Sequence, residues 1–284
     1  MKYEKKYYFL NTILFIFVLC VSIVLYARYL GVKGLIVKEY KVESNILTSN
    51  FSGIKIVHFS DLLYKSTVDS DDVKVLINKI NILKPDIVVF SGDIININSK
   101  IVEEDKEFLI ENLSKIDASI GKYAVYGDYD YSYDDYEEVM RKSDFIILNN
   151  SFDTIYYKDN NPLYIVGLPS SLKDTIDINS SFSFYNEEDR RYTIVLTHEG
   201  ANIKYINEST YEVDLILGGH SLNGSVVVPY YGPLFVDEAS YKYFAPYYNK
   251  GITDIYISSG IGTNEYAFRF NNKPSFNFYR LKAQ

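Results

Sequence analysis

The sequence predicts an α/β protein that follows one apolar N-terminal helix. In the first half of the chain, short apolar runs alternate with segments of helical spacing, which is typical of parallel βαβ units. In the second half, such runs follow one another more closely, with fewer helices between them. We therefore expect two sheets packed face to face, with helices outside. About 47% of the 284 residues are hydrophobic, which is enough to fill such a core.

The N-terminal apolar segment, 7–27, carries no charge and lies between lysines and Arg28. A bilayer-spanning helix needs about 20 apolar residues. A cleavable signal peptide fits less well because Leu25-Tyr26-Ala27 lacks the small residues of a cleavage site. We therefore expect a single-pass membrane anchor at 1–30, a juxtamembrane linker at 31–51 and a folded domain at 52–284.

The charge distribution bears on orientation and on partners. Lys2, Lys5 and Lys6 favour a cytoplasmic N-terminus, which predicts an extracytoplasmic domain, although Arg28 and Lys33 oppose this. The formal net charge of −8 makes nucleic acid an unsuitable partner, because phosphate binding needs clustered Lys and Arg. The sequence identifies no protein partner.

The apolar runs and helical spacings predict the elements in order. The first half reads as strands at 54–59, 86–90 and 123–126, with helices at 72–83 and 103–116. The second half predicts strands at 155–157, 163–166, 193–196, 215–217, 226–228, 254–257 and 276–279.

Polar side chains follow five of these strands directly: Asp61, Asp93, Asp128, His198 and His220. Ligand sites of open α/β sheets form beyond the carboxyl ends of their strands, so these residues are expected at one edge. Each one alone also fits an ordinary turn residue. The ordered set of five favours a common site.

The segments that carry these residues are similar to the motifs of the calcineurin-like metallophosphoesterases. The resemblance runs from Ile54 to Leu281 and is strongest to membrane-anchored or exported bacterial members. It implies a four-layer α/β/β/α sandwich. The matching segments are Phe59-Ser60-Asp61-Leu62-Leu63, Ser91-Gly92-Asp93, Gly127-Asp128-Tyr129-Asp130, Thr197-His198 and Gly218-Gly219-His220-Ser221-Leu222.

The resemblance also implies a two-metal centre, from which this chain departs. One metal site corresponds to Asp93, Asp128, His198 and His220 and keeps its ligands. The other corresponds to Asp61, Asp93 and positions 63 and 222, where the family has histidines and this chain has leucines. Tyr129 occupies the position of the family's catalytic histidine.

These departures predict one divalent metal ion, zinc, manganese or iron, in the retained site. The other site is expected to be empty, with Asp61 a weak ligand. Phosphoester hydrolysis is then impaired or absent, and the alternative is an active one-metal phosphoesterase acting on a small or lipid-linked phosphoester. Tyr129 and Asp130 are the candidate catalytic residues.

Three further patterns have a structural and a functional interpretation. The spacing Asp128-x-Asp130-x-Ser132-x-Asp134 opens like a calcium loop, but it lacks the later glycine and glutamate, so an acidic turn is favoured. His58, within a strand, is favoured as a structural histidine over a ligand. Ser258-Ser259-Gly260 fits a turn of small residues better than a phosphate cradle.

Overall fold

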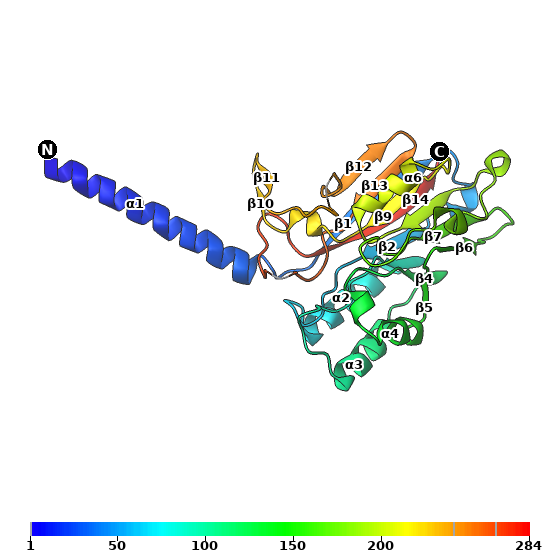
Figure 1. Cartoon of the computed structure of the whole chain (residues 1–284), viewed down its shortest axis with the longest axis horizontal. Helices are drawn as coiled ribbons and strands as arrows, with labels where there is room; N and C mark the ends of the chain where they lie inside the picture. Colours follow the sequence, from blue (N-terminus) through cyan, green and yellow to red (C-terminus); the bar gives the residue numbers. More distant parts are fainter. Residues whose placement is uncertain (1, 241, 265) are drawn as a thin grey trace.

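A long apolar helix precedes the rest of the fold in the computed structural model, which describes residues 2–240, 242–264 and 266–284 (Figure 1). This helix, α1, comprises Lys2–Leu25 and continues into a π-helical turn, Tyr26–Leu30. Its apolar stretch, Tyr7–Leu30, has 24 residues. At about 1.5 Å per residue it is about 36 Å long. It could therefore span the roughly 30 Å hydrocarbon core of a bilayer.

The first sheet has six strands in the order β1-β14-β2-β3-β4-β5. Strands β2 to β5 are parallel, whereas β14 is antiparallel to β2 and parallel to β1. Helices α2, α3 and α4 connect the parallel strands, as the alternating pattern predicted. The strands are β1 Ile36–Ser44, β2 Lys55–Phe59, β3 Ile87–Phe90, β4 Gly121–Ala124, β5 Phe145–Ile147 and β14 Ser275–Ala283, and the helices are α2 Ser70–Leu83, α3 Glu103–Leu113 and α4 Tyr136–Lys142.

The second sheet also has six strands, in the order β12-β13-β9-β8-β7-β6. Its central strands β7, β8, β9 and β13 are parallel, and an antiparallel strand closes each edge. The elements of this half are β6 Ser151–Ile155, β7 Leu163–Gly167, β8 Thr193–Leu196, β9 Leu215–Gly218, β12 Tyr247–Lys250, β13 Thr253–Ile257, the short helices α5 Ile178–Ser181 and α6 Ile203–Asn207, and a two-stranded hairpin of β10 Val227–Val228 and β11 Gly232–Pro233.

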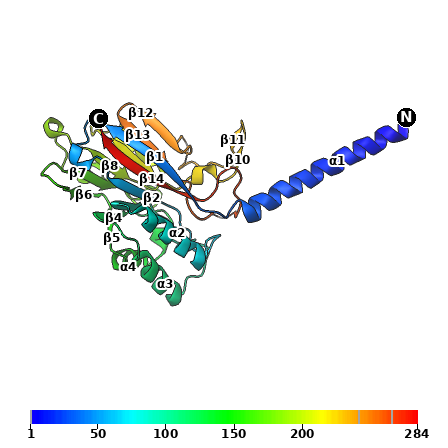
Figure 2. The same ribbon diagram turned by 180° about the vertical axis from the view of Figure 1, so that it is seen from behind.

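Alternate residues of the strands divide the core into layers. Val88 of β3 belongs to the cluster between the first sheet and α2–α4, whereas its neighbour Val89 belongs to the cluster between the two sheets. Ile194 of β8 lies in that same central cluster, and Val195 faces the outer cluster with α6. The predicted α/β/β/α sandwich is confirmed, and Figure 2 shows its two sheets from behind.

Two expectations about element positions were wrong. The segment 31–51, expected as a linker, contains β1, which pairs along its whole length with β14 at the edge of the first sheet. Within the same segment Val42 and Phe51 are buried, so it is part of the domain core. The strand expected at 155–157 lies earlier, at Ser151–Ile155. β1 was missed because its partner, β14, lies at the other end of the chain, whereas β6 pairs with the neighbouring β7 and only its bounds differ.

Candidate metal centre

The five polar residues expected at strand ends meet at one place between the two sheets. Asp61, Asp93 and Asp128 follow β2, β3 and β4, and His198 and His220 follow β8 and β9. The Nε2 atom of His198 is 3.3 Å from Asp93 Oδ2 and 3.4 Å from Asp128 Oδ1. Two groups of ligand atoms, each with all atoms within 4.8 Å of one another, share His198: Asp128, His198, Glu199 and His220 form one, and Asp61, Asp93 and His198 form the other. The five residues expected at the strand ends therefore lie together, and Glu199 joins them.

Hydrogen bonds orient both histidines towards Asp128. His198 Nδ1 is 2.7 Å from the backbone oxygen of Ser91, an acceptor only, so this nitrogen donates its proton and Nε2 faces the carboxylates. His220 Nε2 is 2.7 Å from Asp237 Oδ2, which leaves Nδ1 facing Asp128 Oδ1 at 3.3 Å. Metal-binding histidines are typically held in this way, with the second ring nitrogen donating to a carboxylate or a carbonyl.

Three buried atoms of ligand type have no hydrogen-bond partner within the described part of the chain. They are His198 Nε2, Asp128 Oδ1 and Asp61 Oδ1. Leaving a buried polar atom unpaired costs about 1–3 kcal/mol, and more when it is charged. A divalent cation would satisfy all three, and carboxylate and imidazole donors suit zinc, manganese or iron. The residues present therefore fit a metal ion.

The electrostatics of the centre favour a positive charge. Burial alone would lower the pKa of His198, but Asp93 and Asp128 outweigh it and raise that pKa well above its usual range. Burial also opposes the charged form of His220, yet Asp128 and Asp237 raise its pKa to about 10. Burial would raise the pKa of Asp128, but the two histidines hold it far below its usual value. The same negative field attracts a divalent cation.

Two buried leucines belong to the loops that carry Asp61 and His220. Leu63 and Leu222 are both buried, with exposed fractions of 0% and 2%. A Cβ atom on Gly260 would collide with Leu222 Cδ2 and lie 2.8 Å from Asp61 Cβ, so the Leu222 side chain packs beside Asp61. Leucine has no lone pair to offer a metal. On this side the described ligand atoms come from Asp61, Asp93 and His198.

Positive φ angles concentrate at the centre. Asp61, Leu63, Asp93, His220 and Leu222 have φ values of 48°, 47°, 65°, 64° and 48°. Such left-handed conformations are uncommon for residues other than glycine, and strained ones cost of the order of 1–3 kcal/mol each. The strain is present at both leucine positions as well as at the ligands. Left-handed backbone therefore occurs in the loops after β2, β3 and β9, but not at Asp128 or His198.

The two candidate catalytic residues differ in how they are held. The buried carboxylate of Asp130 accepts backbone hydrogen bonds from Asp93 and Gly127 at 2.8 Å and from Ile94 at 2.9 Å. Asp130 therefore positions the loops that carry the ligands, and this geometry does not support the catalytic role expected for it. Tyr129 is partly exposed, and its backbone nitrogen donates to Asp93 Oδ1 at 3.0 Å.

Two carboxylates at the centre were missed by the sequence analysis. Glu199 follows His198 directly, a signal that was available, and accepts hydrogen bonds from Ser170, Ser171 and Asn202. It therefore secures the loop after β7. Asp237 lies 17 residues after His220, with a hairpin between them, so no periodicity connects the two.

The remaining sequence patterns have structural roles. His58 is fully buried, with Nε2 2.9 Å from Ser91 Oγ, and burial lowers its pKa to about 3. The carbonyl groups of Ser259 and Gly260 accept hydrogen bonds from the buried guanidinium of Arg269. In the acidic segment 128–134, Asp128 faces the metal centre, whereas Asp130 accepts hydrogen bonds from backbone amides. The carboxylates of this segment therefore do not converge on one ion.

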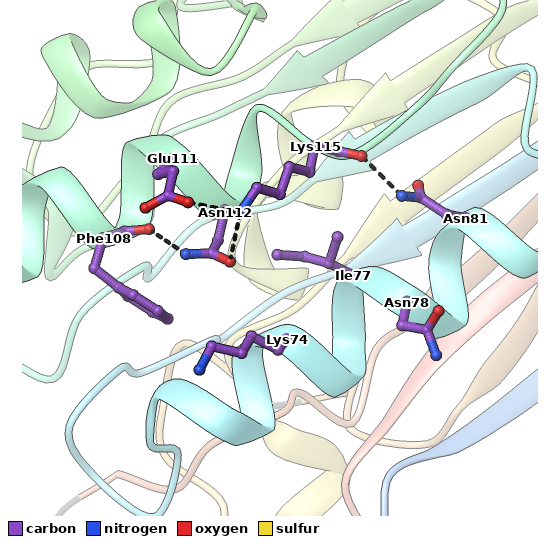
Figure 3. A pocket seen from close by; sticks show the side chains of 8 residues that line it. All are labelled: Lys74, Ile77, Asn78, Asn81, Phe108, Glu111, Asn112 and Lys115. Carbon is purple, nitrogen blue, oxygen red and sulfur yellow. Dashed lines mark hydrogen bonds and ion pairs between the residues drawn. The ribbon is translucent and has the colours of Figure 1, made fainter.

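A separate surface hollow of about 540 Å³ lies between α2 and α3 (Figure 3). Lys115 Nζ pairs with Glu111 at 2.8 Å at its rim, and Asn81 Nδ2 donates to the backbone oxygen of Lys115. These contacts are ordinary helix-surface pairs, and the hollow shares no residue with the metal centre. Its lining residues are Lys74, Ile77, Asn78, Asn81, Phe108, Glu111, Asn112 and Lys115.

Comparison with known proteins agrees with this geometry. The sequence profile described as "Calcineurin-like phosphoesterase" matches residues 54–224. The "Uncharacterized metallophosphoesterase YkuE" of Bacillus subtilis is 31% identical over 262 residues, which cover 91% of this chain and 89% of that protein. The matched regions include all five polar residues that follow the strands.

Two more distant similarities were found. "UDP-2,3-diacylglucosamine pyrophosphatase LpxG" of Chlamydia muridarum is 22% identical over 240 residues, covering 68% of this chain and 70% of that protein. Among solved structures, the calcineurin-like phosphoesterase YfkN from Bacillus subtilis aligns with a TM-score of 0.44 at 16% identity, over 74% of this chain and 82% of that chain.

Proposed function

The chain belongs to the calcineurin-like phosphoesterase family, and on that premise we propose that it is a membrane-anchored member that binds one divalent metal ion. Asp93, Asp128, His198 and His220 would hold the ion. Hydrolysis of phosphoesters would be strongly reduced or absent. The domain would lie outside the cytoplasm, tethered by α1.

One observation above all supports the single ion. The unpaired His198 Nε2 and Asp128 Oδ1 lie 3.4 Å apart, and His220 Nδ1 is 3.3 Å from the same carboxylate oxygen. Each histidine donates its other ring proton to a fixed acceptor. Three donor atoms are thus preorganised around one point, which lowers the cost of binding a cation there.

Reduced hydrolysis follows from what the Asp61 side lacks. A bound divalent ion polarises a phosphoryl oxygen and lowers the pKa of a water ligand, whereas a two-metal site clamps the attacking and leaving oxygens together. Leu63 and Leu222 contribute no donor, so in the described part of the chain that half has only Asp61, Asp93 and the shared His198. Tyr129 is a poor general acid, because an ordinary tyrosine has a pKa of about 10.

The second candidate function is active one-metal hydrolysis of a lipid-linked phosphoester. Asp237 specifically favours it, because a carboxylate behind a metal-binding histidine raises the basicity of that ligand. The similarity to LpxG, whose name describes a pyrophosphatase of a diacylated nucleotide sugar, is consistent with such a substrate. Under this alternative Tyr129 donates the proton to the leaving group.

Metal analysis and turnover measured together separate the two functions. The full chain is purified in detergent, loaded with Mn²⁺ or Zn²⁺, and assayed on an aryl phosphate and on a lipid-linked pyrophosphate. We expect one ion per chain and turnover equal to that of His198→Ala. Turnover clearly above that of His198→Ala would establish the active alternative, and a chain that binds no ion would refute both.

A further inference from the structure

The β10–β11 hairpin exposes a dense group of apolar side chains. Tyr230 and Tyr231 lie in its turn, with exposed fractions of 111% and 77%, and Leu234, Phe235 and Val236 follow at 48%, 70% and 38%. Single exposed apolar residues are common on protein surfaces, but a contiguous group marks a contact with another partner. The hairpin tip has too few residues to bury these apolar side chains against one another.

The hairpin is connected to the end of α1 through the segment that contains Phe270. Val226 forms a bridge with Phe270, and the backbone nitrogen of Val227 donates to its oxygen at 2.9 Å. The Phe270 ring packs edge-on against Tyr26, in the last turn of the apolar helix, with centroids 6.2 Å apart. Next to it, the Arg269 nitrogen donates to the Ala27 oxygen at 3.0 Å.

These contacts place the hairpin at the end of the domain where α1 joins it. In Figures 1 and 2 the labels β10 and β11 lie on that side, away from β6 at the opposite end. If α1 spans a bilayer, Tyr26–Leu30 lies at its interface, where tyrosines are enriched. Arg28 and Lys273 are exposed near this junction and would face anionic headgroups.

We propose that the β10–β11 hairpin is a second membrane contact, which inserts its aromatic tip into the interface beside α1. The partner is the lipid surface itself. This inference rests on the proposed anchoring by α1 but not on whether the metal centre is active. Tyrosine and phenylalanine suit this position because they combine a large apolar area with few rotatable bonds.

Docking of the hairpin would hold the metal centre close to the headgroup layer. The hairpin begins just after His220 and ends just before Asp237, and these two residues are in contact at 2.7 Å. At its base, Gly224 packs so closely against Pro233 that no side chain would fit there. A rigid hairpin with both ends at the centre fixes the height of that centre above the membrane. A phosphoester in a lipid headgroup would then reach it.

Tryptophan fluorescence tests this contact directly, because the chain contains no tryptophan. Tyr231→Trp and Phe235→Trp are made separately in the full chain, which is reconstituted into phosphatidylcholine–phosphatidylglycerol vesicles whose acyl chains carry bromine at two depths, near the headgroup and near the bilayer centre. Phe17→Trp, within α1, is the positive control. Tyr156→Trp is the negative control, since Tyr156 is 62% exposed and follows β6.

We expect both hairpin tryptophans to be quenched comparably to Phe17→Trp and to emit at shorter wavelength than Tyr156→Trp. Hairpin tryptophans that behave like Tyr156→Trp, while Phe17→Trp is quenched, would overturn the hairpin contact and leave the anchor intact; the apolar group would then be assigned to a protein partner. If Phe17→Trp is also unquenched, both the anchor and the hairpin contact fail.

Discussion

The two sides of the metal centre differ in the donors that they offer. On one side, His198 and His220 each direct a ring nitrogen towards Asp128, and their other nitrogens contact Ser91 and Asp237. On the other side, the described ligand atoms are those of Asp61, Asp93 and the shared His198, while the buried Leu63 and Leu222 offer none. The first side therefore has two imidazole donors and the second has one.

Both leucines have left-handed backbone conformations. Leu63 has a φ of 47°, and its nitrogen donates to the Asp93 oxygen at 3.1 Å. Leu222 has a φ of 48°, and its oxygen accepts from Asn272. Asp61, Asp93 and His220 share this conformation, so the contrast between the two sides lies in their side chains.

The largest effect is expected from removing a ligand on the histidine side. Loss of a residue that only hydrogen-bonds to a metal ligand typically lowers metal affinity 10–100-fold. His198→Ala removes a proposed ligand itself, so the loss should be larger. Metal content measured by mass spectrometry after dialysis checks this. The matched control is His58→Gln, a buried histidine outside the ligand set, which should retain the ion. If His198→Ala and His58→Gln lost equal amounts of metal, the loss would not come from removal of a ligand, and the two halves would not differ in ligation.

The backbone shared by both halves is tested by Asp130→Ala. This change leaves three buried amides without their acceptor, and each unpaired group costs about 1–3 kcal/mol, so we expect a loss of about 3 kcal/mol or more. Thermal unfolding in detergent measures it. Asp134→Ala, at an exposed position of the same loop, should change stability by less than about 0.5 kcal/mol.

Asp237→Ala tests the carboxylate that contacts the imidazole of His220. Loss of the carboxylate frees the imidazole to rotate or change tautomer, and we expect metal affinity to fall about 10–100-fold. Competition with a fluorescent chelator gives the affinity. Glu238→Gln, which removes a neighbouring exposed carboxylate, is the control for a change of surface charge. An equal fall in metal affinity in this variant would mean that charge alone explains the loss.

The difference between the halves should be reversible. Leu63→His combined with Leu222→His supplies two further imidazole donors on the side of Asp61 and Asp93, so bound metal should rise from about one towards two ions per chain. Leu63→Met with Leu222→Met conserves volume and should stay at one. If the double histidine variant still binds about one ion per chain, packing of positions 63 and 222 against Gly262 and Gly260 would leave no room for a second ion on the Asp61 side.

The smallest effect is expected from Tyr129→Phe. With hydrolysis already strongly reduced, removing the hydroxyl group should change turnover by less than about twofold. A loss nearer the 10²–10⁴-fold typical of a general acid would instead establish Tyr129 as the proton donor of an active enzyme. The assay is aryl-phosphate turnover at saturating Mn²⁺, with His198→Ala as the background.

Much of the centre was accessible from the sequence because its residues directly follow apolar runs. Asp61, Asp93 and Asp128 each come within four residues of a strand end, so finding the strands was enough to predict that these residues lie together. The role of Asp130 was not accessible. Its partners are amides of the β3 and β4 loops, and a carboxylate that caps amides has the same sequence signature as one that faces a ligand.

The sequence by itself determined the apolar helix, the alternation of strands and helices, and the asymmetry between two histidines and two leucines. These features depend on local periodicity and on residue identity. Only the tertiary structure decided that Ile36–Ser44 pairs with the C-terminal strand, that Asp237 holds His220, and that Phe270 packs against Tyr26 while it pairs with Val226 at the base of the β10–β11 hairpin. Each of these is a contact between distant segments, and such contacts depend on the path of the whole chain, which no local pattern encodes.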